Sequence, residues 1–280
     1  MSINDCQTPL FMPQPCTQTS ELPLPTVDIF NLTDISSTIN LRKTALYIQS
    51  KDDNKMKIIL SQRCLVCKQP SNTSICHYCV DDFTLFDIDR YQHNLMFSPN
   101  VHKGLAKVDF PQVLALADYQ WPLSKLLTGL KFSKHVPNAQ ALAAVFVKYC
   151  LNSIPELPQL IIPIPLHKNR YLHRKFNQSI ELAKHICKLG QLDMDTSILT
   201  RCKSTSAQTD LSAAQRNKNL RNAFEVSEAS ELRLKGYNHI ALFDDVITTG
   251  STMNCAYHCL RKHNSNLRID IWSICLTLVH

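Results

Sequence analysis

One short stretch of the chain, residues 240–252, most constrains the fold. Apolar residues from Ile240 to Phe243 lead directly into two adjacent acids, Asp244 and Asp245. After two apolar residues comes a small, hydroxyl-rich run that precedes a helix-like segment: Thr248, Thr249, Gly250, Ser251 and Thr252. This order predicts a strand, an acidic pair at its carboxyl end, a tight loop and a helix N-terminus, as in an open α/β sheet.

The acids and the loop suit a single kind of ligand. Backbone N–H groups and hydroxyls of the loop can bind a phosphate, and the helix dipole favours its negative charge. Gly250 is one of only 5 glycines in 280 residues, and it lies where the backbone must turn or approach a phosphate closely. A ribose 5-phosphate fits both halves, with its hydroxyls on the acids. A strand and a capped helix without a ligand is the alternative.

Composition bounds the chain without selecting a function. Its 280 residues are 44% hydrophobic and carry a formal net charge of +7, which predicts one or two domains with a sizeable core. No apolar run reaches about 18 residues, so no transmembrane helix or membrane insertion is expected. The N-terminus lacks the basic start and apolar stretch of a secretory signal. The positive charge suits anionic ligands, whether phosphates, pyrophosphate or nucleic acid.

Four of the 12 cysteines form two C-x-x-C pairs in one short stretch: Cys64, Cys67, Cys76 and Cys79. Such pairs can present four thiolates tetrahedrally to Zn²⁺, and a turn at 70–73 would bring them together. A structural zinc contributes folding free energy on the order of 10 kcal/mol. A redox pair is the alternative, and His77 could replace one cysteine. The remaining cysteines are scattered, which is typical of buried thiols in the reducing cytoplasm.

The chain divides into three predicted parts. Residues 1–60 are polar and contain prolines, and we interpret them as a disordered or loosely attached extension. Residues 61–120 are expected to form the zinc-knuckle lobe and a hood, and residues 121–280 the α/β domain. Met56 lies eight residues before Cys64. Translation could begin there, which would give a compact chain that starts with the zinc lobe.

Hydrophobic patterns predict the elements of the α/β domain. Asn138 is expected to cap a helix, and Pro155 and Pro158 to break the chain after it. The segment from 81 to 107 has a mixed pattern and receives no assignment. The expected strands span 113–117, 160–165, 240–243 and 267–278, and the expected helices span 122–131, 138–151, 177–189 and 251–263.

A basic loop follows the expected strand at 160–165. It contains four cationic side chains: Lys168, Arg170, Arg174 and Lys175. Arginine forks and lysine charges suit the oxygens of a diphosphate, so we predict a pyrophosphate loop at the carboxyl end of this strand. A solvated basic turn before the next helix is the alternative.

A long polar segment, residues 200–224, carries Gln208 and Arg216. Loops of this length often cover a ligand site, so we interpret these two residues as part of a lid. Residues 212–220 could equally form a surface helix, and the two interpretations are compatible with each other.

Residues 240–252 resemble the 5-phosphoribosyl-1-pyrophosphate (PRPP) signature of type I phosphoribosyltransferases. Shorter motifs precede it in order: the zinc knuckles, Leu130–Phe132, Ile162–Pro165, Arg174–Gln178, and the series Gln208, Arg216, Asn219 and Phe224. Over residues 64–278 this order resembles the ComF/GntX family of competence-associated, phosphoribosyltransferase-like proteins. The resemblance implies an α/β, type I phosphoribosyltransferase-like fold, with a central, mostly parallel sheet flanked by helices and a small N-terminal zinc lobe with four cysteine ligands.

The resemblance also implies a chemistry. A glycosyltransferase reaction would move phosphoribose from PRPP to an acceptor and release pyrophosphate. Asp244 and Asp245 would be the catalytic acids that orient the ribose hydroxyls, and residues 248–252 would bind the 5-phosphate. Mg²⁺ would bridge the diphosphate and the ribose, and the basic loop would stabilise the departing pyrophosphate.

One position departs from that family, whose members usually carry glycine where this chain has Lys175. Glycine would allow a positive φ and close approach to pyrophosphate, whereas lysine adopts such a backbone at a cost. Either the backbone is ordinary at Lys175 or the pyrophosphate subsite is altered. Besides the transferase, two other functions fit these residues: a PRPP-sensing regulator without turnover, and a nucleic-acid-handling accessory of competence with single-stranded DNA or competence proteins as partners.

Overall fold

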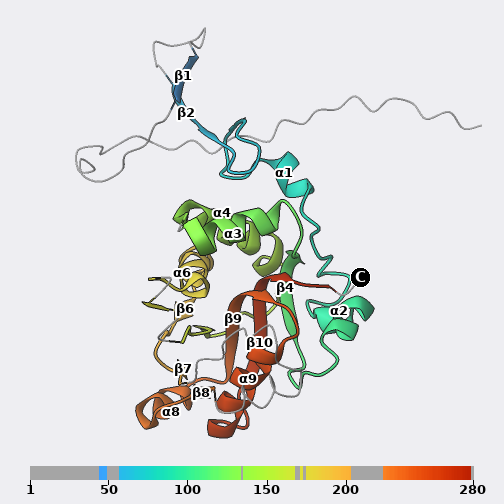
Figure 1. Ribbon diagram of the computed structural model, residues 1–280, viewed down its shortest axis with the longest axis vertical. Helices are drawn as coiled ribbons and strands as arrows, with labels where there is room; N and C mark the ends of the chain where they lie inside the picture. Colours follow the sequence, from blue (N-terminus) through green and yellow to red (C-terminus); the bar gives the residue numbers. More distant parts are fainter. Residues whose placement is uncertain are drawn as a thin grey trace, which may run out of the picture. The chain divides into compact units, whose positions relative to one another are not determined.

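The computed structural model describes residues 44–48, 57–133, 135–167, 171–172, 175–202 and 223–278. Within them, five parallel strands form a central sheet (Figure 1). The strands follow one another across the sheet in the order β4 (Val113–Asp118), β10 (Arg268–Leu276), β9 (His239–Ile247), β5 (Leu160–Pro163) and β6 (Asp193–Met194). The predicted α/β fold with a mostly parallel sheet is therefore confirmed.

The chain reverses its direction of travel across the sheet between β5 and β9. From β5 it passes through a helix to β6 on one side, and from β9 it passes through another helix to β10 on the other side. In open α/β sheets, ligands bind outside the carboxyl ends of the strands at such a reversal. The topology therefore marks the ends of β5 and β9 as the place to look for a site.

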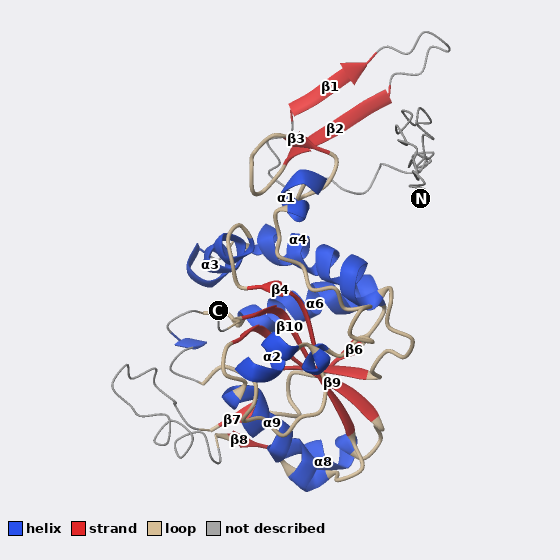
Figure 2. Cartoon of the chain, turned by 90° about the vertical axis from the view of Figure 1, so that its right-hand side faces the viewer, coloured by secondary structure: helices blue, strands red, loops and turns tan. Residues whose placement is uncertain are grey.

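Helices cover both faces of the sheet (Figure 2). On one face lie α3 (Leu123–Ser133), α4 (Val136–Phe146) and α6 (Gln178–Gly190), and α9 (Ser251–His263) lies on the other. The ring of Phe146 on α4 lies 6.1 Å from that of Phe243 on β9 and 5.9 Å from that of Trp272 on β10. These aromatic contacts bury a large apolar area and hold the helical layer on the sheet.

Shorter elements complete the described fold. The strands β1 (Thr44–Ile48), β2 (Lys57–Arg63) and β3 (Pro70–Ser71) pair antiparallel in a separate sheet, and β1 and the start of β2 lie within the range 1–60 that the composition assigns to an extension. The remaining elements are α1 (His77–Asp81), η1 (Leu95–Phe97), α2 (Pro99–Gly104), η2 (Val147–Leu151), β7 (Thr200–Arg201), β8 (Phe224–Glu225) and α8 (Glu228–Leu234).

Among the predicted boundaries that differ from the structure, two differ for local reasons. The helix expected to begin at Asn138 begins at Val136, because Pro137 in the first turn has the backbone angle that a helix start requires. Asn138 is buried inside the helix instead of capping it, and its Nδ2 donates to the Leu126 carbonyl at 2.8 Å. The strand expected to reach Pro165 ends at Pro163. The Ile164 N–H still donates to the Phe243 carbonyl of β9 at 2.8 Å, but the Ile164 carbonyl accepts from the Asn177 Nδ2 at 2.9 Å.

The sheet extends into the range 61–120 that the sequence assigned to the zinc lobe and hood, because β4 is one of its strands. The division of the chain at residues 60 and 120 stays a prediction. Within the part of the chain that the structure describes, no helix combines the length and the apolar character needed to cross a lipid bilayer.

Candidate functional site

The two acids of the sequence motif lie on β9 just past its last pairing with β5. That pairing ends at Phe243, opposite Pro163, whereas pairing with β10 continues to Ile247. The strand therefore continues two residues beyond Asp245, although Asp244 was expected near its end. Both carboxylates therefore lie at the carboxyl end of the sheet, at the reversal that the topology marks, where β5 no longer pairs with β9.

Asp244 is held by two hydrogen bonds. Its Oδ1 accepts from the Ser179 hydroxyl at 2.6 Å and from the backbone N–H of Asp245 at 2.9 Å. Burial, followed by the charge of Asp245, raises the pKa of Asp244 to about 7, although these hydrogen bonds act in the opposite direction. Asp244 can consequently hold or release a proton near neutral pH.

Asp245 is 5% exposed and carries an ion pair with Lys131 on α3. The Lys131 Nζ lies 2.8 Å from the Asp245 Oδ2. That oxygen has no partner with hydrogen-bond geometry among the described residues, so the contact is mainly electrostatic. Burial of a carboxylate away from water is offset by such an opposite charge.

Sequence reasoning named neither Lys131 nor Ser179 as a site residue. Lys131 lies in the Leu130–Phe132 motif, and Ser179 directly follows Gln178, so both stand inside or beside segments that the family resemblance had marked. Their partners lie 114 and 65 positions away in the sequence, and no local spacing rule joins residues so distant.

The small loop after β9 wraps the start of α9, as the sequence predicts. Gly250 precedes the first helical residue with φ at +71°, the left-handed region that glycine occupies at little cost. No side chain caps this helix end. Together with Asp244, residues 246–253 line a small hollow of about 50 Å³. The helix N-terminus thus offers donors to an anion beside the acid pair.

The backbone at Lys175 is left-handed, with φ at +58°. Lys175 therefore adopts the left-handed conformation that glycine would allow at this position in the family that the chain resembles. For lysine the steric cost is roughly 1–2 kcal/mol. The Lys175 N–H donates to the Tyr171 carbonyl at 2.5 Å, and its side chain is exposed. Arg170 and Arg174 of the predicted pyrophosphate loop lie outside the described residues.

Both residues of the predicted lid, Gln208 and Arg216, also lie outside the described residues. The chain enters and leaves that segment through the pair of short strands β7 and β8, where the Cys202 N–H donates to the Ala223 carbonyl at 2.9 Å. The lid interpretation stays a prediction.

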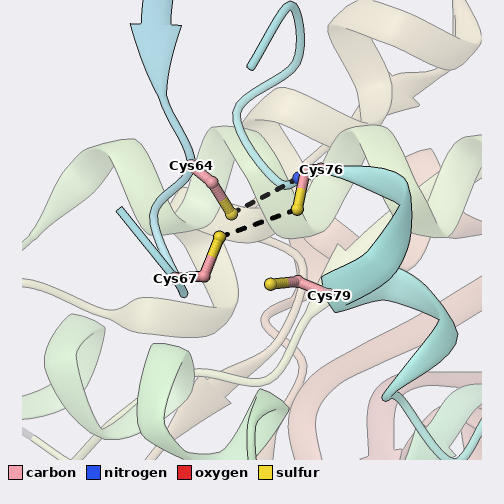
Figure 3. A group of neighbouring side chains, drawn as sticks. All are labelled: Cys64, Cys67, Cys76 and Cys79. Carbon is pink, nitrogen blue, oxygen red and sulfur yellow. Dashed lines mark hydrogen bonds between the residues drawn. The ribbon is translucent and has the colours of Figure 1, made fainter. Parts of the chain in front are cut away.

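The four clustered cysteines point toward one another (Figure 3). The Sγ atoms of Cys64, Cys67, Cys76 and Cys79 all lie within 4.8 Å of each other, and those of Cys67 and Cys76 are 3.8 Å apart. The first knuckle, residues 64–68, is closed by a local hydrogen bond from the Lys68 N–H to the Cys64 carbonyl at 3.0 Å. Lys68 has a left-handed backbone there, with φ at +66°. The group could hold a metal ion such as zinc.

The Cys64 thiol loses its proton more readily than an ordinary cysteine. Burial by itself would raise the pKa of Cys64, but hydrogen bonds from the backbone of Cys76, Cys67 and Val66 outweigh it and lower the pKa to about 6. Burial and the neighbouring thiols raise the pKa of Cys79. Metal ligation requires thiolates, so a bound cation would release the protons that the crowded thiols keep.

Comparison with known proteins gives a consistent set of relatives. The chain is 34% identical over 171 residues to the DNA utilization protein YhgH of Escherichia coli K12, and 35% identical to that of Shigella flexneri; each alignment covers 60% of this chain and 73% of the relative. Competence protein F of Haemophilus influenzae is 32% identical over 167 residues, which are 58% of this chain and 72% of that protein.

No family model matches the chain. The relatives nevertheless share about a third of their residues with it over nearly three quarters of their own length. Such identity, extended over most of a relative, is enough to establish common descent. The chain therefore belongs to the ComF family, which includes Competence protein F and the DNA utilization protein YhgH.

Proposed function

We propose that this protein binds PRPP, or another phosphorylated ribose, at the end of β9. The observation that carries this proposal is the acid pair at the topological reversal, followed within six residues by an uncapped helix N-terminus with Gly250 in the left-handed region. A ribose 5-phosphate has vicinal hydroxyls that suit carboxylates and a dianion that suits a helix start. The two halves of the site match the two ends of this ligand.

In the proposed complex, Asp244 and Asp245 accept hydrogen bonds from the ribose hydroxyls. The phosphate lies in the hollow lined by residues 246–253 and accepts hydrogen bonds from the N–H groups at the start of α9 and from the loop hydroxyls. Lys131 pairs with the buried Asp245, and Ser179 fixes the orientation of the Asp244 carboxylate.

The proposed reaction is transfer of phosphoribose to an acceptor. The bond between C1 of the ribose and the pyrophosphate oxygen breaks, and its electron pair leaves with the pyrophosphate. A nitrogen of the acceptor forms the new bond to C1, and its proton passes to a base or to water. Positive charge develops at C1 in the transition state, and the acid pair stabilises it. Arg170, Arg174 and Lys175 stabilise the leaving diphosphate.

Magnesium fits the chemistry of this site. Mg²⁺ prefers oxygen ligands and usually takes one or two carboxylates together with substrate phosphates. The acid pair and the loop hydroxyls supply donors of this kind. When bound with PRPP, Mg²⁺ supplies charge neutralisation for the diphosphate. Asp244 has a pKa of about 7, and it would bind Mg²⁺ and PRPP best when its carboxyl group is ionised.

We also propose zinc as the ion of the cysteine group. A tetrahedron with Zn–S bonds of about 2.3 Å has edges of about 3.8 Å, and the Cys67 and Cys76 sulfurs are 3.8 Å apart. Four thiolates leave no open position, so such an ion would be structural. The ion would stabilise the fold of the knuckles around Cys64 and Cys79.

The relatives' names support a role for the proposed activity in DNA utilisation or competence, and we propose the cytoplasm as its compartment. The same names, together with the net charge of +7, favour a second candidate function. In that alternative the protein is a non-catalytic accessory that handles single-stranded DNA or contacts competence proteins, or a regulator that binds PRPP without turnover.

A screen for pyrophosphate release separates these functions. Purified protein would be incubated with PRPP, Mg²⁺ and a panel of nucleobases, and binding of PRPP and of single-stranded DNA would be measured in parallel. Release that depends on one acceptor and is lost in Asp245→Asn supports the transferase. Binding of PRPP without release supports the regulator. Binding of DNA without any affinity for PRPP would overturn the proposed function.

A further inference from the structure

The segment between α2 and β4 packs against Gly250 of the small loop after β9, residues 248–252, here called the phosphate loop. A Cβ atom added to Gly250 would lie 2.7 Å from Val108 Cγ1, 3.1 Å from Leu105 Cδ2 and 3.4 Å from Phe110. The Phe110 ring also meets the Tyr257 ring of α9 edge to face, with centroids 6.4 Å apart. Residues 105–110, here called the brace, therefore determine the space that the Gly250 backbone can occupy.

Polar contacts fasten this brace to α9 through Asp109. Its backbone N–H donates to the Asn254 Oδ1 at 2.8 Å, and its Oδ2 accepts from the Asn254 Nδ2 at 2.9 Å. The His258 Nε2 lies 2.6 Å from the same Oδ2. Hydrogen bonds from Asn254 and then His258 hold the pKa of Asp109 below its usual range.

Asn254 connects these contacts to the loop itself. Its backbone N–H donates to the Gly250 carbonyl at 2.8 Å, which closes the first turn of α9, while its side chain holds Asp109. One residue thus ties the position of Gly250 to the position of the brace. Asn254 and His258 are one helical turn apart, so both side chains reach Asp109 from the same face of α9.

We infer that Asp109 is a positioning residue. Its side-chain contacts with Asn254 and His258, here called the clasp, hold the brace on α9 and so fix the phosphate loop for its ligand. The inference rests on the proposed function, because it assigns the loop to a phosphate. Asp109 itself is too exposed and too negative to bind the phosphate, and it acts through Asn254 and Gly250. Loss of the clasp would leave the loop in several conformations, so binding would then include the cost of ordering it.

Charge and position predict opposite effects for Asp109→Ala. Removing a carboxylate near an anion site should strengthen phosphate binding by electrostatics alone. Loss of the clasp should instead weaken ribose 5-phosphate binding, about three- to tenfold for the one or two hydrogen bonds removed. Asp89→Ala is the matched control, because Asp89 is likewise an exposed acid paired with a histidine, but its partner His93 lies only four residues away in its own segment.

A second pair of variants separates a hydrogen-bond role from a general loss of structure. His258→Gln keeps an N–H donor near the position of the His258 Nε2, whereas His258→Ala removes it. We expect ribose 5-phosphate affinity to be nearly retained in the first and reduced about threefold in the second. Amide hydrogen exchange of residues 248–253, measured without ligand, should speed up in Asp109→Ala and His258→Ala while the exchange of β9 and β10 stays unchanged.

The measurements distinguish this inference from the proposed function. Faster exchange at 248–253 together with weaker ribose 5-phosphate binding in Asp109→Ala supports the clasp. If Asp109→Ala matches Asp89→Ala in both readouts, the clasp is overturned even when the wild type binds the ligand. If the wild type fails to bind ribose 5-phosphate and PRPP, the proposed function fails, and the clasp's assignment to a phosphate site fails with it, whatever the exchange shows.

Discussion

The cysteine group and the acid-and-loop site are built in opposite ways. All four cysteines come from residues 64–79, and hydrogen bonds between near neighbours hold them together. The acid-and-loop site instead takes its carboxylates from β9, a lysine from α3, a hydroxyl from α6 and a supporting segment from 105–110. The first is a local structure that a metal could complete, whereas the second exists only when the whole sheet is folded.

This difference predicts how each site should fail. Loss of one cysteine should remove an ion and unfold a short stretch, with little effect on the sheet. Loss of one group around β9 should change both the stability of the domain and its affinity for a ligand, because those residues are buried and paired across elements.

Cys76→Ser should give the largest change. The variant is expected to lose nearly all bound zinc, because three thiolates and a hydroxyl bind zinc far more weakly than four thiolates, and the zinc site contributes on the order of 10 kcal/mol to local folding. Metal content by mass spectrometry should fall from about one zinc per chain toward zero. Cys202→Ser, at an exposed cysteine outside the group, should keep its zinc. Equal zinc content in both variants would refute the site.

Lys131→Met should destabilise the domain by about 3 kcal/mol, because it leaves Asp245 buried without its cation. Urea unfolding would measure the loss. Lys125→Met, at an exposed lysine of the same helix, should change stability by less than about 0.5 kcal/mol. The double variant Lys131→Met, Asp245→Asn should regain most of the lost stability. No recovery in the double variant would show that the pair does not act as a unit.

Asp244 should give stability a pH dependence of its own. Its folded pKa of about 7 lies above the ordinary value of 3.8, so the folded state holds a proton that the unfolded chain releases between those values. Relative to Asp244→Asn, the wild type should lose on the order of a few kcal/mol as pH rises from about 4 to about 7, and no more above that range. Parallel urea titrations that show no difference in slope would contradict a raised pKa.

Gly250→Ala should have a smaller effect of about 2 kcal/mol, from the left-handed backbone and the 2.7 Å approach to Val108. It should also weaken ribose 5-phosphate binding, because the loop must shift. Gly104→Ala is the control, since nothing lies within 4 Å of an added Cβ there. Thermal unfolding of the two variants tests the difference, and equal midpoints would show that the loop tolerates a side chain.

The contrast between the two sites also explains how much the sequence could predict. The cysteine spacing specifies its group directly, and the order of strand, acids, loop and helix locates β9 and α9 within a few residues. Lys131 and Ser179 were missed because contacts across elements depend on the packing of α3 and α6, which no local pattern encodes. Asn138 was misassigned as a cap because its buried bond to Leu126 is also a tertiary contact.

Lys175 shows a different limit. The sequence offered two alternatives, an ordinary backbone or an altered subsite, and propensity favours an ordinary backbone for lysine. The structure instead holds Lys175 at a φ of +58°, with its N–H bonded to the Tyr171 carbonyl. The backbone at Lys175 thus departs from what its residue type favours, and the residue type alone could not reveal it.

The ribose-phosphate site at the end of β9 can be tested by calorimetric titration of ribose 5-phosphate, in the presence of Mg²⁺, into the wild type and Asp245→Asn. We expect saturable binding to the wild type. We expect affinity reduced about ten- to a hundredfold in Asp245→Asn, since a charge-assisted hydrogen bond to a ribose hydroxyl is lost. Asp89→Asn should bind like the wild type. Equal affinity in Asp245→Asn and the wild type, or no binding to the wild type, would contradict the ribose-phosphate site.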